Sequence, residues 1–199
     1  MARRRTVLAI VGLPGSGKSL ASVMLKRMGF GIIELGDIWR ELLEKNGIPR
    51  SDPKATREFT RMIREKYGKD VYAKHAFRKI RSLRGDVAVL GIRSTYEMDY
   101  FRRRIKDMGV IALLAPMGVR FGRLKARAKP EDPKVLEDLK WLDTRERRGF
   151  MKEKSEEKHG VMKVMEGADF VIANTSTVQK LEQNLKKAVK EIEMRNTKS

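Results

Sequence analysis

The chain has no cysteine among its 199 residues, so it cannot form a disulfide framework and carries no sign of secretion. It has only two histidines, His75 and His159, and neither has a second His or Cys at metal-ligand spacing. We therefore interpret both as structural or surface residues. No apolar run is long enough to span a bilayer. These absences predict a soluble, cytoplasmic protein with no membrane partner.

Aromatic residues make up only 7% of the chain, and no aromatic-rich platform for stacking bases is visible. Acidic residues are also outnumbered, with 26 Asp and Glu against 45 Lys and Arg, which gives a net charge of +19. Such a charge favours polyanionic or phosphorylated partners. Because the basic residues are spread along the sequence, nucleic acid binding is a second hypothesis that the sequence does not favour.

One stretch carries a specific signal, the sequence Gly12-Leu13-Pro14-Gly15-Ser16-Gly17-Lys18-Ser19. It reads G-x-x-x-x-G-K-S, follows an apolar run and precedes apolar residues at helical spacing, as a phosphate-binding loop requires. We expect its backbone N–H groups to form an anion nest at a helix N-terminus. Lys18 would reach the terminal phosphates, and the Ser19 hydroxyl would bind Mg²⁺. The residues that we expect to hold the phosphates are Gly12, Pro14, Gly15, Ser16, Gly17, Lys18 and Ser19.

Five short apolar runs alternate with helical stretches, and none of them alternates strictly with polar residues. This pattern is typical of strands buried on both faces, and hence of an α/β fold with a parallel sheet. The chain length indicates a single domain. The runs are Val7–Val11, Gly31–Leu35, Asp86–Leu90, Val110–Ala115 and Asp169–Ala173.

Substrates of such folds collect at the carboxyl ends of the strands. After the second run, Glu34 and Asp37 are candidates to orient an acceptor or hold metal-bound water, and Arg40 is a candidate to clamp an acceptor phosphate. An equally good explanation of Asp37 is that it caps a helix starting at Ile38. After the third run, Gly91-Ile92-Arg93-Ser94 places Arg93 where it could contact a bound phosphate.

Further helices are predicted on either side of these strand ends. The spacing predicts helices over Lys54–Tyr67, Val71–Leu83 and Glu97–Met108. In the first of these, Arg57, Arg61 and Arg64 share one face, which we interpret as a solvated basic face.

A helix–turn–helix rich in arginine lies between the fourth and fifth runs. Arg120, Arg123 and Arg127 share one helix face, and a second helix covers Leu136–Gly149. We interpret residues 119–150 as a lid that brings guanidinium groups to a transferring phosphoryl group. After the fifth run, Asn174 begins a polar loop that either lies against a nucleotide base or caps the last helix, since Ser176 and Gln179 fit a capping box.

In this order, the motifs resemble those of P-loop nucleoside monophosphate kinases, and most closely archaeal adenylate kinase-related and dephospho-coenzyme A kinase-like proteins. The resemblance implies a three-layer α/β/α fold with a five-stranded parallel sheet of order 2-3-1-4-5. It also implies ATP as donor with Mg²⁺. The core would be about 1–36, 84–118 and 160–199, with an acceptor-binding insertion at about 37–83 and the lid at about 119–150.

Carried over by position, Asp37, Arg40 and Arg93 would face a phosphorylated small-molecule acceptor. Arg123 and Arg127 would be lid arginines, and Asn174 would lie near the adenine. The expected catalytic set is Lys18, Asp37, Arg93, Arg123 and Arg127. The sequence does not decide between a monomer and a homodimer.

One departure from the family pattern concerns Leu90, because relatives usually carry an Asp directly before Gly-x-Arg. A leucine cannot accept a hydrogen bond from metal-bound water. Either Asp37 or Glu34 then carries that role, or catalysis is weakened. The sequence thus supports an ATP-dependent nucleotide kinase, with a nucleotide-responsive binding protein or slow ATPase, RNA-associated or not, as the alternative.

Overall fold

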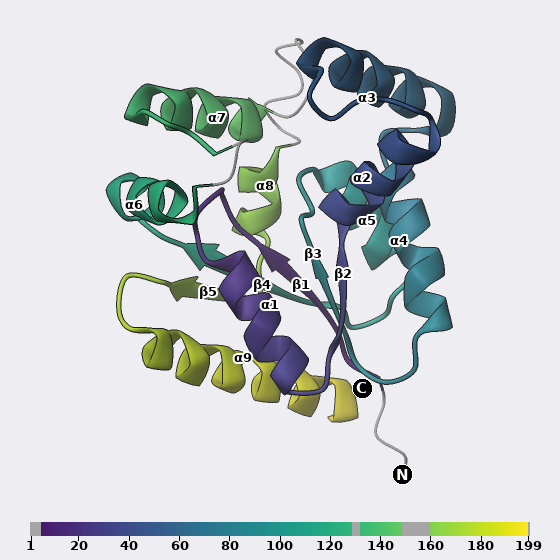
Figure 1. Cartoon of the computed structure of the whole chain (residues 1–199). Helices are drawn as coiled ribbons and strands as arrows, with labels where there is room; N and C mark the ends of the chain where they lie inside the picture. Colours follow the sequence, from purple (N-terminus) through teal and green to yellow (C-terminus); the bar gives the residue numbers. More distant parts are fainter. Residues whose placement is uncertain (1–4, 129–131, 149–159, 199) are drawn as a thin grey trace.

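The computed structural model describes residues 5–128, 132–148 and 160–198, and it has a five-stranded parallel sheet at its centre (Figure 1). The strands follow one another across the sheet in the order β2-β3-β1-β4-β5, and each neighbouring pair is parallel. This confirms the α/β fold and the order 2-3-1-4-5 predicted from the sequence. The strands are β1 (Val7–Val11), β2 (Gly31–Glu34), β3 (Val87–Leu90), β4 (Gly109–Leu114) and β5 (Phe170–Ala173).

Helices cover both faces of the sheet, which explains why the strands are continuous apolar runs. One face packs against α1 (Lys18–Arg27) and α9 (Val178–Lys198), and Leu8, Ile10 and Leu90 belong to this side of the core. Residues on alternate positions, such as Ala9 and Val89, belong to the opposite side.

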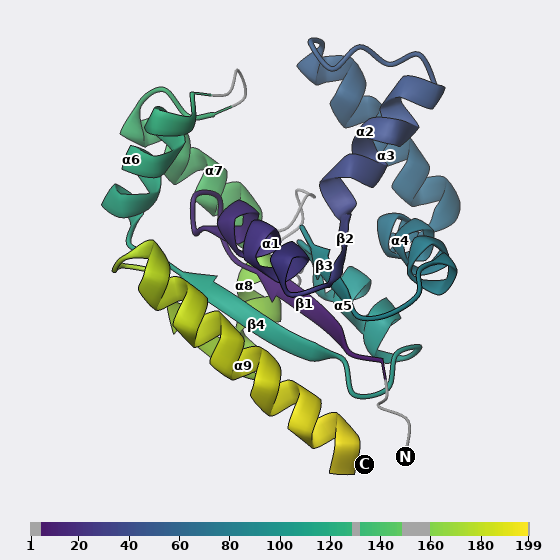
Figure 2. The same cartoon turned by 60° about the horizontal axis from the view of Figure 1, so that its bottom comes forward.

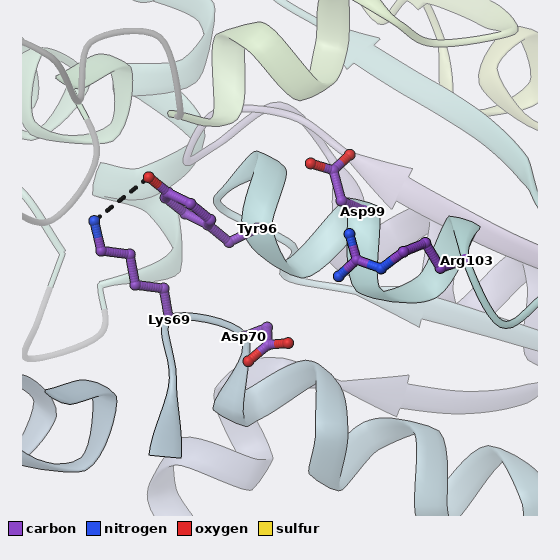
Figure 3. A pocket seen from close by; sticks show the side chains of 5 residues that line it. All are labelled: Lys69, Asp70, Tyr96, Asp99 and Arg103. Carbon is purple, nitrogen blue, oxygen red and sulfur yellow. Dashed lines mark hydrogen bonds between the residues drawn. The ribbon is translucent and has the colours of Figure 1, made fainter. Parts of the chain in front are cut away.

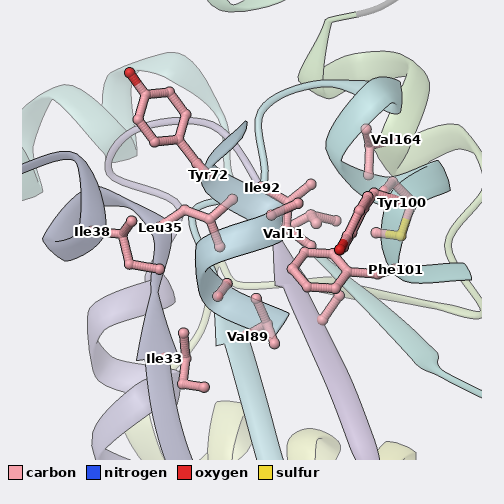
Figure 4. Close-up of a cluster of buried hydrophobic side chains, with 14 of the residues drawn as sticks. Val11, Ile33, Leu35, Ile38, Tyr72, Val89, Ile92, Tyr100, Phe101 and Val164 are labelled. Carbon is pink, nitrogen blue, oxygen red and sulfur yellow. The ribbon is translucent and has the colours of Figure 1, made fainter. Parts of the chain in front are cut away.

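The second side of the core is formed with helices from the middle of the chain. Figure 4 shows side chains from β1, β2 and β3 meeting those of α2, α4, α5 and α8, with Phe101 fully buried among them. The helices concerned are α2 (Leu35–Lys45), α3 (Pro53–Tyr67), α4 (Val71–Ser82), α5 (Thr95–Arg102) and α8 (Val161–Glu166).

Two groups of helices stand beyond the carboxyl ends of the strands. Figures 1 and 2 show α6 (Met117–Arg127) and α7 (Leu136–Arg148) on one side and α2 and α3 on the other. Because all five strands are parallel, the residues that follow them reach the edge of the sheet between these groups. No helix in the described ranges is both long and apolar enough to cross a membrane.

Several helix boundaries differ from those predicted. The helix expected from Ile38 begins at Leu35, directly after β2, so Asp37 lies in its first turn and is not a cap. The helix expected over Glu97–Met108 is α5, which ends at Arg102. Gly149, the predicted end of α7, lies outside the described residues.

The last helix is capped one residue later than predicted. The Thr177 hydroxyl accepts a hydrogen bond from the Lys180 N–H at 3.2 Å. Thr177 therefore caps α9, and the proposed capping box at Ser176 and Gln179 was wrong by one position.

Candidate active site

The phosphate-binding loop has the backbone conformation that its glycines permit. Gly15 and Gly17 have φ values of +77° and +109°, in the region that side chains avoid. The surroundings are equally tight, since a Cβ atom on Gly17 would lie 2.2 Å from the Asn174 Nδ2 atom. The loop is therefore fitted closely to the elements behind it.

Asn174 and Arg123, both predicted site residues, hold the loop from the side of β5 and α6. The buried Asn174 side chain donates from Nδ2 to the Ser16 carbonyl at 2.8 Å. Arg123 donates from Nη2 to the Asn174 carbonyl at 2.9 Å. The end of β5, the first helix of the predicted lid and the loop thus form one hydrogen-bonded unit.

Arg120 joins the loop to α6 and α7. Its buried guanidinium donates to the Pro14 carbonyl at 3.0 Å and to the Asp143 carboxylate at 2.9 Å. The Arg120–Asp143 ion pair is almost fully buried on both sides, so it holds α7 against α6 and the loop.

Lys18 lies at the centre of the site. Its ammonium donates to the Gly12 carbonyl at 2.5 Å and to the Leu13 carbonyl at 3.0 Å. Burial lowers the pKa of Lys18 from 10.5 to about 8. Nearby charges act on the same pKa: Arg93 and Arg127 lower it, whereas Glu146 and Glu34 raise it. Two predicted catalytic arginines are thus close enough to Lys18 to influence its charge.

Arg93 is held by a carboxylate that sequence analysis did not single out. Its Nη1 atom donates to Glu146 Oε1 of α7 at 2.9 Å, and Glu146 is only 5% exposed. In the sequence, Glu146 stands within a strongly charged helix, where a carboxylate usually lies on a solvated face. No local pattern signals that this one is buried at a strand end.

Asp37 and Arg40, the other predicted acceptor residues, form an ion pair with each other on α2. Among the described residues, neither of them is hydrogen-bonded to the phosphate-binding loop. Glu34, the second candidate, stands beside Leu90 in the sheet register and contributes to the field at Lys18. Of the two carboxylates proposed to replace the missing Asp, Glu34 is thus the one that contributes to the pKa of Lys18.

A buried pair behind Arg93 was also missed. The Glu97 carboxylate accepts from the Arg93 N–H at 2.8 Å and lies 3.7 Å from the Arg64 guanidinium. Burial raises the pKa of Glu97 above its usual value, while Arg64 lowers it. Arg64 is thus not part of a solvated face, although Arg57 and Arg61 are exposed. The pattern Ser94-x-x-Glu97 is a capping-box signal that could have revealed this residue.

The donor set fits a magnesium–nucleotide complex. Two buried polar atoms of predicted site residues, Ser16 Oγ and Arg123 Nη1, have no hydrogen-bond partner within the described parts of the chain. Ser19 lies in the first turn of α1, next to Lys18. The described residues contain no cluster of three or more His, Asp or Glu that could hold a metal. Such a site suits a cation bound through phosphate oxygens and one hydroxyl.

A shallow pocket of about 280 Å³ lies between α4 and α5 (Figure 3). Its side chains carry both signs of charge, and Lys69 donates to the Tyr96 hydroxyl at 3.4 Å. None of its residues is a predicted site residue. The pocket is lined by Lys69, Asp70, Tyr96, Asp99 and Arg103.

Comparison with curated proteins finds relatives in archaea. A UPF0200 protein of Pyrococcus horikoshii is 34% identical over 191 residues, covering 94% of this chain and 97% of the relative. A UPF0200/UPF0201 protein of Archaeoglobus fulgidus is 36% identical over 196 residues, covering 94% of this chain. The chain spans 57% of the length of that second relative.

Among solved structures, similar folds occur in kinases. A gluconokinase from Sinorhizobium meliloti aligns with a TM-score of 0.58 at 13% identity, covering 98% of this chain and 97% of that structure. A shikimate kinase from Aquifex aeolicus aligns with a TM-score of 0.51 at 14% identity, covering 93% and 96%. At these identities the likeness shows the fold alone.

The match to a protein family covers most of the chain. Residues 8–158 match the family described as an AAA domain, and this range includes the phosphate-binding loop, α2 to α7 and strands β1 to β4. The sheet order and the solved structures of similar fold show that this family match lies on a P-loop kinase fold. The chain therefore belongs to the AAA domain family and to the UPF0200 group.

Proposed function

We propose that the protein is an ATP-dependent phosphotransferase that moves the γ-phosphoryl group of ATP to a nucleotide or nucleotide-like acceptor. One observation carries the proposal: Lys18 of the phosphate-binding loop lies close enough to Arg93, which follows β3, and to Arg127 of α6 for both to lower its pKa. Phosphoryl transfer requires mainly positioning and neutralisation of charge, which these side chains supply.

In this proposal each part of the site has a defined role. The loop amides and Lys18 bind the ATP phosphates, and Asn174 and Arg123 keep the loop in shape. Ser19 would hold a Mg²⁺ ion, which when bound offsets phosphate charge. Arg93 and Arg127 would stabilise the charge of the transferring group, and α7 would exclude water from it.

The acceptor would enter on the side of α2, α3 and α4. Arg40 lies there on α2, and the acceptor classes that fit the resemblance are nucleoside monophosphates and dephospho-coenzyme A. The two kinases of similar fold, a gluconokinase and a shikimate kinase, are named after small-molecule substrates. This supports an acceptor of similar size.

Incubation with ATP, Mg²⁺ and a panel of AMP, CMP, UMP and dephospho-coenzyme A tests the proposal. We expect a phosphorylated product from at least one acceptor and its loss in the variant Lys18→Ala. Lys26→Ala is the matched control, because Lys26 is exposed in the last turn of the same helix. ATP turnover without any phosphorylated acceptor would support the alternative of a slow ATPase.

A further inference from the structure

Five arginines beyond the strand ends are each paired with a carboxylate of the same chain, whereas Arg123 of α6 donates to the Asn174 carbonyl. Three of these pairs have partners far apart in the sequence or on different helices, and each involves a predicted acceptor-side or lid element. The pairs are Arg40–Asp37, Arg64–Glu97, Arg93–Glu146, Arg120–Asp143 and Arg127–Asp132.

This pairing limits what the site can bind. A clamp for an acceptor phosphate relies on guanidinium groups whose charge the phosphate neutralises. On the acceptor side, carboxylates already pair with Arg40 and Arg64, and the Arg64–Glu97 pair is too buried for either charge to be left alone without a large penalty. The site is therefore poorly suited to a second phosphate at the point of transfer.

The position of Glu146 indicates which kind of acceptor group can react at the site. It reaches the end of β3 from α7, lies 2.9 Å from Arg93, and raises the pKa of Lys18 through its charge. A carboxylate in that place repels an approaching phosphate oxygen, which carries no proton to give. For a hydroxyl group the same carboxylate is a suitable proton acceptor.

The site also lacks a carboxylate where one would be expected. Leu90 ends β3 directly before Gly91 and Arg93, and Asp37 is paired with Arg40 on α2. Glu34 stands next to Leu90 and acts on Lys18, which suits it to metal-bound water. Glu146 of α7 also acts on Lys18, and it pairs with Arg93, which would contact the transferring group.

We propose that the reacting group of the acceptor is a hydroxyl and that Glu146 is the catalytic residue that takes its proton. This inference rests on the proposed kinase function and selects the hydroxyl-bearing acceptor class over transfer to a monophosphate group. The acceptor oxygen forms a bond to the γ-phosphorus, and the bond from that phosphorus to the β,γ-bridging oxygen breaks. The electron pair leaves with ADP, and the hydroxyl proton passes to the Glu146 carboxylate.

The type of bond in the product tests the proposal without any variant. Phosphorus NMR of the products distinguishes a phosphate monoester, formed on a hydroxyl, from a diphosphate, formed on a phosphate. The panel contains dephospho-coenzyme A, adenosine and gluconate beside AMP, CMP and UMP, each with ATP and Mg²⁺. We expect a monoester, and a diphosphate as the main product would overturn the inference while leaving the kinase function intact.

Variants then test the role of Glu146. With the best acceptor, Glu146→Gln should lower kcat by about 100-fold or more, because a general base contributes about 10² to 10⁴. KM for ATP should stay within about threefold, and Glu146→Asp should recover part of kcat because it retains a carboxylate. Glu137→Gln on the same helix is the control, since Glu137 is exposed and forms a surface ion pair with Lys140.

Two further outcomes would overturn the inference. If Glu146→Gln transfers phosphate as fast as the wild type or faster, Glu146 is not the base that takes the hydroxyl proton. If no acceptor of either kind yields a product, the kinase function fails and this inference fails with it.

Discussion

At Lys18, burial lowers the pKa of the side chain, whereas a bound anion would raise it. The pKa of Lys18 is lowered to about 8, because burial penalises the ammonium and Arg93 repels it. A bound triphosphate would favour the ammonium form. The charge on this residue is therefore coupled to nucleotide binding.

This coupling predicts that the affinity for ATP falls as the pH rises above about 8, by up to about tenfold per pH unit. The sign follows because the empty folded protein loses the Lys18 proton near pH 8, whereas the complex keeps it. Binding of a fluorescent ATP analogue between pH 7 and 9.5 measures the effect. The variant Lys18→Met should bind weakly and without this dependence, and a constant wild-type affinity would contradict the prediction.

The lowered pKa of Lys18 also makes the free energy of unfolding depend on pH, but this quantity rises with pH where the affinity for ATP falls. In the unfolded chain Lys18 stays charged up to about its ordinary pKa of 10.5, so the unfolded state binds more protons between about pH 8 and 10.5. The contribution of Lys18 to the free energy of unfolding of the empty protein should therefore rise with pH in that window. Comparing chemical denaturation of wild type and Lys18→Met across it isolates this contribution.

Gly17 offers a test of the loop itself. In Gly17→Ala the new Cβ would meet the Asn174 amide at 2.2 Å, at a φ of +109° that alanine resists. We expect loss of measurable ATP binding and destabilisation by about 1–3 kcal/mol. Gly118→Ala is the control, because nothing lies within 4 Å of a Cβ there and alanine is the better helix former by about 0.5–1 kcal/mol. Equal ATP binding by the two variants would contradict our description of the loop.

At the scale of elements, α7 is fixed by two carboxylates on one face. Asp143 holds Arg120 of α6, and Glu146 holds Arg93 beyond β3. Both carboxylates are buried, whereas Trp141 on the same helix is 61% exposed. Polar contacts with α6 and with Arg93 beyond β3 thus fix the rotation of α7 about its own axis.

Asp143→Ala should lower the free energy of unfolding by about 3 kcal/mol, because it leaves the buried Arg120 guanidinium without its carboxylate. Urea denaturation measures the change. Glu137→Ala, which removes an exposed pair with Lys140, should change stability by less than about 1 kcal/mol. A similar small effect of both variants would show that the Arg120–Asp143 pair does not hold α7.

Elements were predictable from the sequence to different degrees. The strands could be found because each is a short apolar run, and β1, β3 and β4 are buried along almost their whole length. Their order followed from the family resemblance. The start of α2 could not, because β2 passes into helix at Leu35 without a loop, and the apolar Leu35 and Ile38 then face the core. Asp37, a residue type that often caps helices, therefore led to a predicted helix start that was three residues too late.

The site was predictable only in part, for a similar reason. The loop residues are consecutive, so one motif identifies them all, and Arg93 follows a strand directly. The ion pairs Arg93–Glu146 and Arg120–Asp143 join residues 53 and 23 positions apart. No spacing in the sequence encodes such partners, since they meet only when β3, α6 and α7 are packed together.

At the scale of the whole molecule, the net charge of +19 is much larger than the site needs. Many of the arginines near the strand ends are neutralised by carboxylates, so the excess charge belongs to the exposed surface. A surface of this kind binds polyanions through their phosphates without regard to sequence.

We therefore expect the protein to bind single-stranded RNA non-specifically at about 50 mM salt and to lose most of this affinity, by about 10³-fold for a contact with several phosphates, near 200 mM. Fluorescence anisotropy with two RNAs of unrelated sequence measures it. Phosphotransfer should be unaffected by the RNA. Retention of tight binding at 200 mM salt, or a strong preference for one sequence, would contradict this and favour an RNA-associated function.

The spacing of Asp143 and Glu146 limits where a residue could be inserted into α7. Residues three apart in an α-helix lie on the same side, and each added residue turns the rest of the helix by about 100°. One residue inserted between them would leave Asp143 in place and swing Glu146 away from Arg93. Insertions before Leu136 would preserve the phase between the two carboxylates. Tolerance to insertion should therefore drop sharply within these few positions of α7, and a library of single-residue insertions would map that boundary.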